Sequence, residues 1–292
     1  GPFFDRTFKY WALLPAIAIL VLLTLYPTVK LLRMSVSEIS VGSDASVTWE
    51  YVGDKHVRTA IEDPVVGVAI RNTLVFVVIV VICEVTLGLV LALLISRTNR
   101  MTAVYRTIFL LPLLMPPIAI GTMWKLMYDY NYGLFNMILG LAGIQGPTWT
   151  ADPNLAMMCI IIVDIWHWTS FLFLILMAGV ESLPHELVEV ARVDGATELQ
   201  TYRYILLPLL RPTIVIALVL RTIFAFKVFD QIYLLTSGGP GTATEVLNLY
   251  IYDVFFVQFR MGYGSFLAIV LAVLMTVFVI FYRWVNTRLA RD

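Results

Sequence analysis

The sequence predicts an all-α membrane protein: one domain, residues 1–292, with six transmembrane helices and a helix-turn-helix outside the lipid. Three observations predict this class. Hydrophobic residues make up 60% of the 292 residues and charged residues only 14%, and the mean hydropathy is +0.87. Several apolar runs reach about the 20 residues that a helix needs to cross a hydrocarbon core. One long helical pattern, by contrast, is too polar to lie in lipid.

The apolar runs place the transmembrane helices in order. The expected spans are residues 11–32, 73–95, 107–127, 155–180, 213–233 and 265–284. The third contains Pro112, Pro116 and Pro117, which remove helical hydrogen bonds, so we expect a broken or bent helix there. The stretch 236–242 is dense in Gly, Ser and Pro and is expected to be a non-helical loop.

Basic residues decide the orientation. Six spans put both termini on one side, and the segments on that side hold Arg6, Lys9, Arg97, Arg100, Arg106, Arg192, Arg203, Arg211, Arg283, Arg288 and Arg291. The opposite segment 128–154 holds no Lys or Arg. Because Lys and Arg concentrate in cytoplasmic loops, we expect both termini and residues 182–208 to be cytoplasmic.

The polar helical pattern lies in residues 182–208. Ser182 is expected to cap a first helix, with Pro184 at or near its first position and Glu186 and Glu189 at the positive end of its dipole. Asp194-Gly195 is expected to end that helix, because Gly readily adopts the left-handed conformation at a helix end. Apolar residues at three-to-four spacing then predict a second helix.

This segment resembles the EAA loop of ABC-importer permeases. Glu189, Ala191, Gly195, Ile205, Leu207 and Pro208 occupy the positions of that motif, and only Val190 departs from it. The resemblance implies a coupling helix that seats on an ATPase subunit. It implies that Glu189 docks, that Ala191 allows close approach and that Gly195 permits the turn, with Arg192 and Asp194 in the same docking stretch.

The resemblance extends over nearly the whole chain. The Trp-x-Trp run at 166–168 and the run 226–241 are similar to the carbohydrate branch of these permeases, of maltose, trehalose and glycerol-3-phosphate type. It implies a first permease for a sugar or polyol in a bacterial or archaeal plasma (inner) membrane. The implied partners are a second homologous permease, two ATPase subunits, an extracytoplasmic solute-binding protein and membrane lipid. ATP and Mg are then bound by the ATPases, and this chain needs no cofactor.

Ionisable residues inside spans are costly, so each one is a candidate for function. The candidate substrate path is Asp164, His167, Trp168, Phe224, Lys227 and Asp230. Carboxylate and imidazole suit sugar hydroxyls, and aromatic faces suit the apolar side of a sugar ring.

Structural interpretations of the same residues stay open. Asp164 and His167, one helical turn apart, also fit a buried hydrogen-bonded pair between helices that binds no ligand. Lys227 and Asp230 are spaced at i and i+3, so they also fit an ion pair with each other on one helix. Glu84 and Arg221 are expected to pair within the bundle or with the partner subunit.

Other function classes find little support. The sequence has no GxxxxGK[ST] loop for ATP, and His185-Glu186 is followed by Glu189 where a zincin has its second His. The few histidines are too scattered for a metal site, and zero net charge does not suggest nucleic acid. The chain is therefore not expected to be an enzyme. The alternative is an ion-coupled secondary transporter with Glu84 or Asp164 as its essential acid, which leaves the spacing from Glu189 to Pro208 unexplained.

Overall fold

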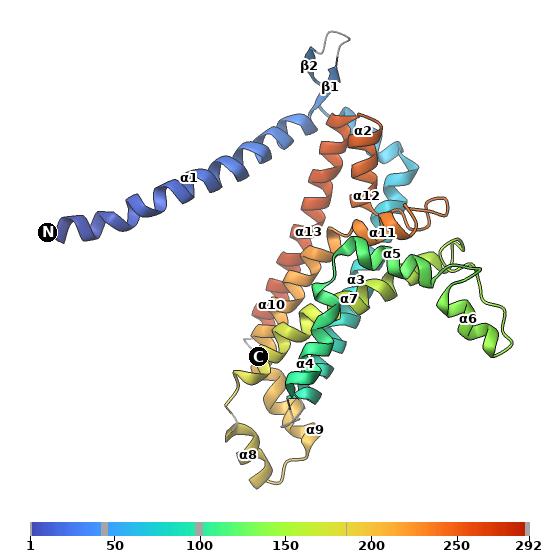
Figure 1. Cartoon of the computed structure of the whole chain (residues 1–292). Helices are drawn as coiled ribbons and strands as arrows, with labels where there is room; N and C mark the ends of the chain where they lie inside the picture. Colours follow the sequence, from blue (N-terminus) through green and yellow to red (C-terminus); the bar gives the residue numbers. More distant parts are fainter. Residues whose placement is uncertain (1, 42–45, 97–101, 185, 290–292) are drawn as a thin grey trace. The chain divides into compact units, whose positions relative to one another are not determined.

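The computed structural model describes residues 2–41, 46–96, 102–184 and 186–289, with the backbone alone at 2–11, 41, 102 and 289. The chain divides into two compact units (Figure 1). Unit 1 comprises Gly1–Pro64 and Tyr250–Ala272, and unit 2 comprises Val65–Leu249 and Val273–Asp292. The expected positions Arg97, Arg100, His185 and Arg291 lie outside the described residues.

Unit 1 begins with the long helix α1, Pro2–Ser35. Its apolar part, Ala12–Ser35, is long enough to cross a membrane and overlaps the first expected span. A hairpin follows, β1 Ser37–Val41 paired antiparallel with β2 Val47–Tyr51, and then the short helix α2, Lys55–Glu62. The connection after the first span is therefore structured rather than an open loop.

Hydrogen bonds fasten this N-terminal part of unit 1 to its C-terminal part. The carboxylate of Asp63 accepts hydrogen bonds from the hydroxyls of Tyr250 at 2.6 Å and Tyr263 at 3.0 Å. Tyr250 lies in α12, Leu247–Tyr252, and Tyr263 in α13, Met261–Leu289. The buried His56 ring lies 3.2 Å from the Ser37 carbonyl. These contacts hold together the two chain segments that make up unit 1.

Unit 2 is a helical bundle around α3, Pro64–Ile95, α7, Ala156–Glu181, and α10, Leu207–Phe226. Apolar side chains from these helices form its core, among them Phe76, Val80, Ile160, Leu172, Phe173, Leu176 and Leu210. The remaining part of α13 also belongs to this unit, where Phe278 packs edge-on against Phe226 with ring centroids 5.2 Å apart.

Close packing of α3 on α7 depends on Gly88. A Cβ atom at this position would lie 3.1 Å from both the Leu172 Cβ and the Phe173 backbone nitrogen. We therefore expect Gly88→Val to destabilise the bundle by about 1–3 kcal/mol, the usual cost of overpacking. Gly67→Val is the matched control, because Gly67 lies in the same helix with open space beside it. A thermal melt in detergent checks this, and equal melting temperatures for the two variants would contradict it.

The third expected span is broken, as its prolines predict. It consists of α4, Thr102–Leu110, a 3-10 turn, Leu111–Leu114, and α5, Pro117–Met127. The two parts are bent by 93° at the break. Among the described residues there are five helices that could each cross a membrane, or six if this bent pair is one span. The second, fourth and sixth expected spans coincide with α3, α7 and α13.

The fifth expected span, 213–233, is wrong at both ends. The helix ends at Phe226, and a separate short helix, α11, Asp230–Leu235, follows a break. At its start, the continuous helical stretch reaches back to Glu198 through a π-helical segment, Tyr202–Leu206. At the break, polar Lys227, Asp230 and Gln231 alternate with apolar residues. The backbone shows where the helix is interrupted, because the φ and ψ of Phe229, −146° and −60°, are not helical.

The Gly-rich loop after α11 is non-helical, as expected. It is held by the side chain of Asn72 on α3, whose Nδ2 donates to the carbonyls of Thr242 at 3.1 Å and Glu245 at 2.9 Å. The neighbouring Thr73 hydroxyl accepts a hydrogen bond from the Leu247 backbone nitrogen at 2.9 Å. This loop is therefore fixed to α3.

Candidate functional site: the coupling segment and the buried charge network

The polar segment after α7 forms the expected helix-turn-helix. Its first helix is α8, Glu186–Val193, with Glu186 and Glu189 in the first turn and Arg192 in the last. Ser182 ends α7, where its hydroxyl donates to the Gly179 carbonyl at 2.7 Å. Its expected role as the cap of the next helix stays a prediction, because the adjoining residue 185 lies outside the described residues.

Gly195 makes the turn after α8. Its φ of +78° lies in the left-handed region that favours glycine. The Gly195 nitrogen donates to the Arg192 carbonyl at 3.1 Å, and the Ala196 nitrogen donates to the Ala191 carbonyl at 2.9 Å. This pair of bonds is a Schellman motif, which satisfies the last carbonyls of a helix. The positive φ at this turn thus explains why residue 195 is glycine.

The second helix begins with a capping box that sequence reasoning missed. The Gln200 nitrogen donates to the Thr197 hydroxyl at 3.4 Å, and the Thr197 nitrogen donates to the Gln200 side-chain oxygen at 2.7 Å. The Thr-x-x-Gln spacing was the signal that could have revealed it. From here α9, Glu198–Thr201, runs through the π-helical segment into α10. The end of the coupling segment is therefore also the start of a spanning helix.

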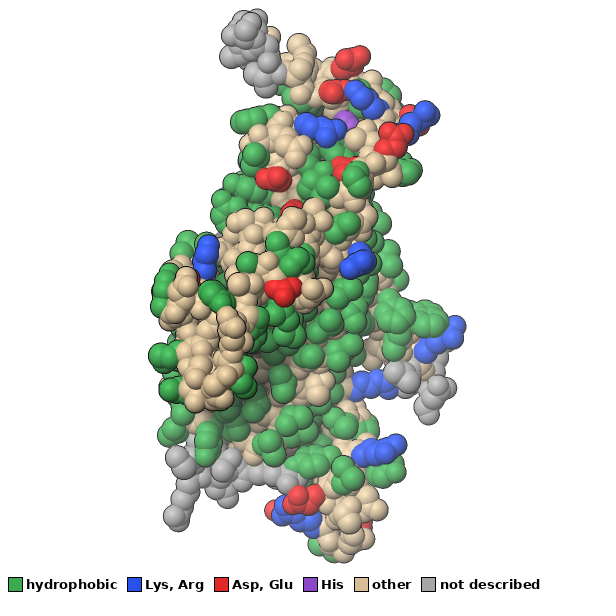
Figure 2. All heavy atoms as spheres, turned by 90° about the vertical axis from the view of Figure 1, so that its right-hand side faces the viewer, with side chains coloured by type: hydrophobic (Ala, Val, Ile, Leu, Met, Phe, Trp, Pro, Cys, Tyr) green, Lys and Arg blue, Asp and Glu red, His purple; other side chains and the backbone are tan. Residues whose placement is uncertain are grey.

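We call α8 and α9 with their turn the coupling segment. It lies at the end of the unit 2 bundle away from α11 (Figure 1), and charged side chains gather there on the face shown in Figure 2. Glu189, Arg192 and Asp194 are exposed, whereas Ala191 is buried. Large apolar side chains are exposed beside them: Leu187, Val190, Val193 and Leu199. Such an apolar patch rimmed by charges is typical of a protein-protein contact.

Three ionisable side chains meet inside the bundle. Glu84 on α3, Asp164 on α7 and Arg221 on α10 are each at most 1% exposed. The Arg221 guanidinium bonds both carboxylates, with its Nη2 3.0 Å from the Glu84 Oε1. Because buried charges are costly unless paired and hydrogen-bonded, this cluster holds the three helices in one arrangement. The expected pairing of Glu84 with Arg221 within the bundle is confirmed.

Polar and aromatic side chains extend this cluster. The Arg221 guanidinium lies 5.0 Å from the centre of the Trp168 ring, and Trp168 stacks on Phe224 with centroids 5.1 Å apart. The buried His167 places its Nδ1 3.3 Å from the Gln231 Nε2 on α11. Asp164 and His167 are therefore each bonded to another helix, and the side chains that reach them are Arg221 and Gln231. We call Glu84, Asp164, Arg221, His167 and Gln231 the buried network. The half-buried Trp168 and the exposed Phe224 lie beside it.

Lys227 and Asp230 lie elsewhere. Both are exposed, and they sit on either side of the break between α10 and α11 rather than on one helix. Within the described part of the chain, no salt bridge joins them. The Lys227 carbonyl accepts a hydrogen bond from the Asn248 side chain at 3.0 Å. The expected pairing at helical spacing is therefore not present, because the helix ends between the two residues.

Comparison with known proteins identifies the family. Residues 84–291 match the family described as the binding-protein-dependent transport system inner membrane component. The chain belongs to this family. The permease is 41% identical, over 72% of its length and 70% of the relative's, to the trehalose/maltose transport system permease protein MalF of Thermococcus litoralis. It is 35% identical, over 97% of its length and 92% of the relative's, to the sulfoquinovosyl glycerol transport system permease protein SmoG of Agrobacterium fabrum.

A solved structure agrees with this assignment. The permease superimposes on a chain of a bacterial ABC transporter that imports the acidic polysaccharide alginate, with a TM-score of 0.84 and 25% identity. The match covers 98% of this chain and 97% of that one. The protein is therefore a multi-pass membrane permease of an ATP-driven, binding-protein-dependent importer. An ion-coupled secondary transporter is not favoured.

Proposed function

We propose that this permease imports a sugar, most simply a di- or oligosaccharide, or a polyol. The relatives support this class, since the names of two of them refer to trehalose, maltose and a glycosyl glycerol. The aromatic pair Trp168 and Phe224 beside the buried charges offers the mixed polar and apolar surface that a sugar ring requires. Asp164, His167, Lys227 and Asp230 remain candidates for the path along which the substrate moves.

The coupling segment is the proposed contact with an ATPase subunit. The observation that carries this proposal is its exposed apolar patch at one end of the bundle, together with the continuous helical stretch from α9 into α10. A lone permease would leave this patch in water, and a partner surface would cover it. Glu189 is the docking residue, with Arg192 and Asp194 beside it, while the buried Ala191 allows α8 to pack closely on the body of the permease.

The full assembly would contain this chain, a second homologous permease, two ATPase subunits and an extracytoplasmic solute-binding protein. A related alginate transporter has been solved in complex with a periplasmic protein that holds a pentasaccharide. ATP and Mg belong to the ATPase subunits in this scheme, and the permease itself catalyses no reaction. It resides in a bacterial or archaeal plasma membrane, with both termini and the coupling segment in the cytoplasm, where Lys and Arg concentrate.

The proposed mechanism follows from the continuity of the coupling segment with α10. Closure of the ATPases on ATP would move α8 and α9. The α10 helix would move with them, because α9 and α10 form one continuous helical stretch. Arg221 on α10 would then move α3 and α7 in the same step, since its guanidinium binds a carboxylate on each. The bundle would then rock as one rigid body, and this motion would change the importer from inward-open to outward-open.

We expect Glu189→Lys to abolish copurification of the ATPase. Reversing the charge of an exposed docking residue replaces an attraction by a repulsion, which lowers affinity by about tenfold or more. The permease and its genomic neighbours are coexpressed, purified in mild detergent and identified by mass spectrometry. Glu50→Lys is the matched control, because Glu50 is an exposed glutamate in the β2 strand of unit 1. Equal ATPase recovery with both variants would refute the docking assignment.

The substrate class is tested separately by uptake. The assembly is reconstituted in proteoliposomes with its binding protein and offered trehalose, maltotriose, lactose and glycerol, each radiolabelled. We expect ATP-dependent uptake of at least one member of this panel. Uptake of none of them, by an assembly that still hydrolyses ATP, would refute the sugar and polyol assignment.

A further inference from the structure

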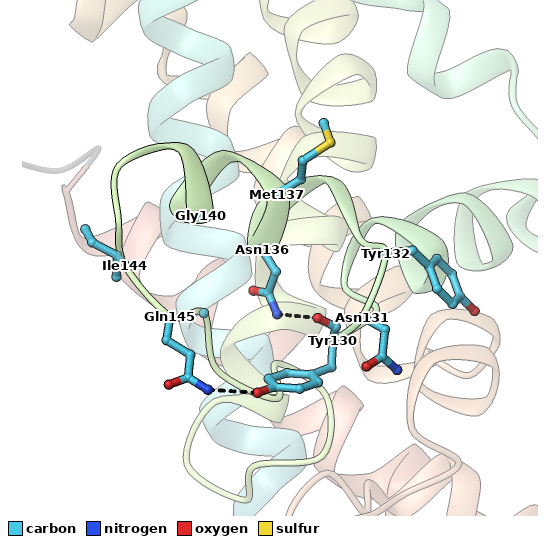
Figure 3. A pocket seen from close by; sticks show the side chains of 9 residues that line it. Tyr130, Asn131, Tyr132, Asn136, Met137, Gly140, Ile144 and Gln145 are labelled. Atoms are coloured by element: carbon cyan, nitrogen blue, oxygen red, sulfur yellow. Dashed lines mark hydrogen bonds between the residues drawn. The ribbon is translucent and has the colours of Figure 1, made fainter.

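A hollow lies around the short helix α6, Leu134–Leu141, far along the chain from the coupling segment (Figure 3). It measures about 540 Å³, and its lining contains two tyrosines, two asparagines and a glutamine beside apolar Met137 and Ile144. No charged side chain is among the residues that line it. Its wall is therefore both polar and neutral.

Hydrogen bonds fix the walls of this hollow. The Asn136 side chain donates to the Tyr130 carbonyl at 3.1 Å and to the Pro147 carbonyl at 3.3 Å, and it accepts from the Trp149 indole at 2.7 Å. The Asp129 carboxylate accepts from the backbone nitrogen of Asn131 at 2.8 Å. Both ends of the loop are thus held before any ligand arrives, which lowers the entropy cost of binding.

An aromatic cluster packs next to the hollow, where its Trp149 contacts Asn136 of the lining. Trp124, Tyr128, Phe135 and Trp149 pack against one another with ring centroids 5.1–6.1 Å apart. Tyr128 also donates from its hydroxyl to the Cys159 carbonyl on α7 at 3.2 Å, which ties the cluster to the bundle. The hollow is therefore part of a rigid platform and not a loose loop.

The aromatic ring and the amides that line the hollow match the chemistry of a sugar. The Tyr130 ring is 44% exposed, and its hydroxyl accepts a hydrogen bond from the Gln145 amide at 3.1 Å (Figure 3). The Asn131 side chain makes no hydrogen bond to the described residues. Amides both donate to and accept from hydroxyls, and an aromatic face packs on the apolar side of a pyranose. A phosphate or carboxylate ligand would instead require a cation that the lining lacks.

We propose that this hollow is a subsite for a neutral saccharide, with the Tyr130 ring as its platform and the amides of Asn131 and Gln145 as its hydroxyl partners. The inference rests on the proposed sugar transport. In the proposed topology, the loop 128–154 lies outside the cytoplasm, so the subsite would hold the saccharide on the side from which it enters the permease.

The test measures binding and uptake on the whole assembly. The probe is whichever of trehalose, maltotriose and lactose is taken up fastest. Without the binding protein, the assembly in nanodiscs is expected to give a saturation-transfer NMR signal on the ring protons of that probe. Tyr130→Ala and Gln145→Leu are expected to weaken this NMR signal. In proteoliposomes they should raise the KM of uptake by roughly three- to tenfold and leave kcat unchanged, because they remove contacts that bind the substrate equally in the ground and transition states.

The controls separate the possible outcomes. Tyr51→Ala removes an exposed tyrosine in unit 1 and is expected to leave both readouts unchanged. Gln145→Leu keeps the side-chain volume, so it tests the amide where Tyr130→Ala yields too little protein. Unchanged signal and KM in both variants, with wild-type uptake intact, would overturn the subsite and leave sugar transport standing. A stronger signal from a glucuronic acid disaccharide than from the neutral probe would also overturn it. Absence of uptake of every panel member by the wild-type assembly would overturn the proposed function, and the subsite with it.

Discussion

Replacing Arg221 with methionine is expected to abolish transport and to lower the yield of folded permease. The substitution leaves the carboxylates of Glu84 and Asp164 buried without a cation. Removal of one member of a buried ion cluster costs about 3–5 kcal/mol, because the remaining charges keep their desolvation penalty. The loss also disconnects α10 from α3 and α7, so the helix that continues the coupling segment no longer moves its neighbours.

Neutralising the carboxylates as well should restore part of the folded yield. In the triple variant Arg221→Met, Glu84→Gln, Asp164→Asn, no unpaired charge remains in the bundle, so we expect more protein than from Arg221→Met alone. Transport should stay low, because amides and a thioether do not form the bidentate contacts of a guanidinium. A recovered yield with low transport would show that Arg221 acts in the motion of the helices as well as in folding.

Arg211→Met is the matched control for this series. Arg211 lies on the same helix, is only partly buried, and donates to the Asn286 carbonyl at 3.3 Å. We expect a small change, since partly exposed polar contacts contribute about 1 kcal/mol or less. The yield is measured by fluorescence-detected size-exclusion chromatography and transport by uptake into proteoliposomes. Equal transport by Arg221→Met and Arg211→Met would show that the buried network is dispensable.

Replacing Gly195 with valine is expected to uncouple ATP hydrolysis from uptake while leaving membrane insertion intact. Gly195 adopts a φ of +78°, and a Cβ atom there would meet nothing within 4 Å. The substitution therefore acts through the backbone alone. A left-handed conformation costs an L-residue roughly 1–2 kcal/mol, and more for a β-branched one, which is enough to open the Schellman turn. The α8 helix would then move without transmitting its displacement to α9 and α10.

Two controls isolate this backbone effect. Gly195→Asn should retain most of the coupling, because asparagine tolerates the left-handed region. Gly53→Val carries the same kind of strain in unit 1, where φ is +58° with open space beside it, and should leave coupling unchanged. The measurement is the ratio of ATP hydrolysed to substrate imported in proteoliposomes. A ratio for Gly195→Val equal to that of the wild type would refute the transmission role of this turn.

The extent of the spans shows what a sequence reveals and where it stops. Helices α7 and α13 lie within a few residues of the expected spans 155–180 and 265–284. Hydropathy could place them because a lipid-crossing helix must be apolar along about 20 residues and then become polar. The end of α10 at Phe226 was missed, because apolar residues such as Val228 and Ile232 follow it. Polar Lys227, Asp230 and Gln231 interrupt these apolar residues at the break, and the backbone shows that the helix ends there.

The polar residues show the same division. The coupling segment was recognised because its features are local: acidic residues at a helix start, a glycine at its end and a motif at fixed spacing. The Thr197 capping box is equally local, because it depends only on the Thr-x-x-Gln spacing. Asp164 was different, since a hydrogen bond between helices was one interpretation of it, but the sequence did not name its partner, Arg221 on α10. Spacing along one helix cannot show which side chain a different helix brings near.

The sequence by itself determined the class of this protein, the position of most spans and the coupling segment, because composition, helical periodicity and turn chemistry act over a few residues. The tertiary structure alone decided that Arg221 joins two carboxylates from two helices, that α10 continues the coupling segment and that α6 encloses a neutral hollow. These features depend on segments far apart in the chain, and packing in three dimensions is what brings their side chains within contact distance.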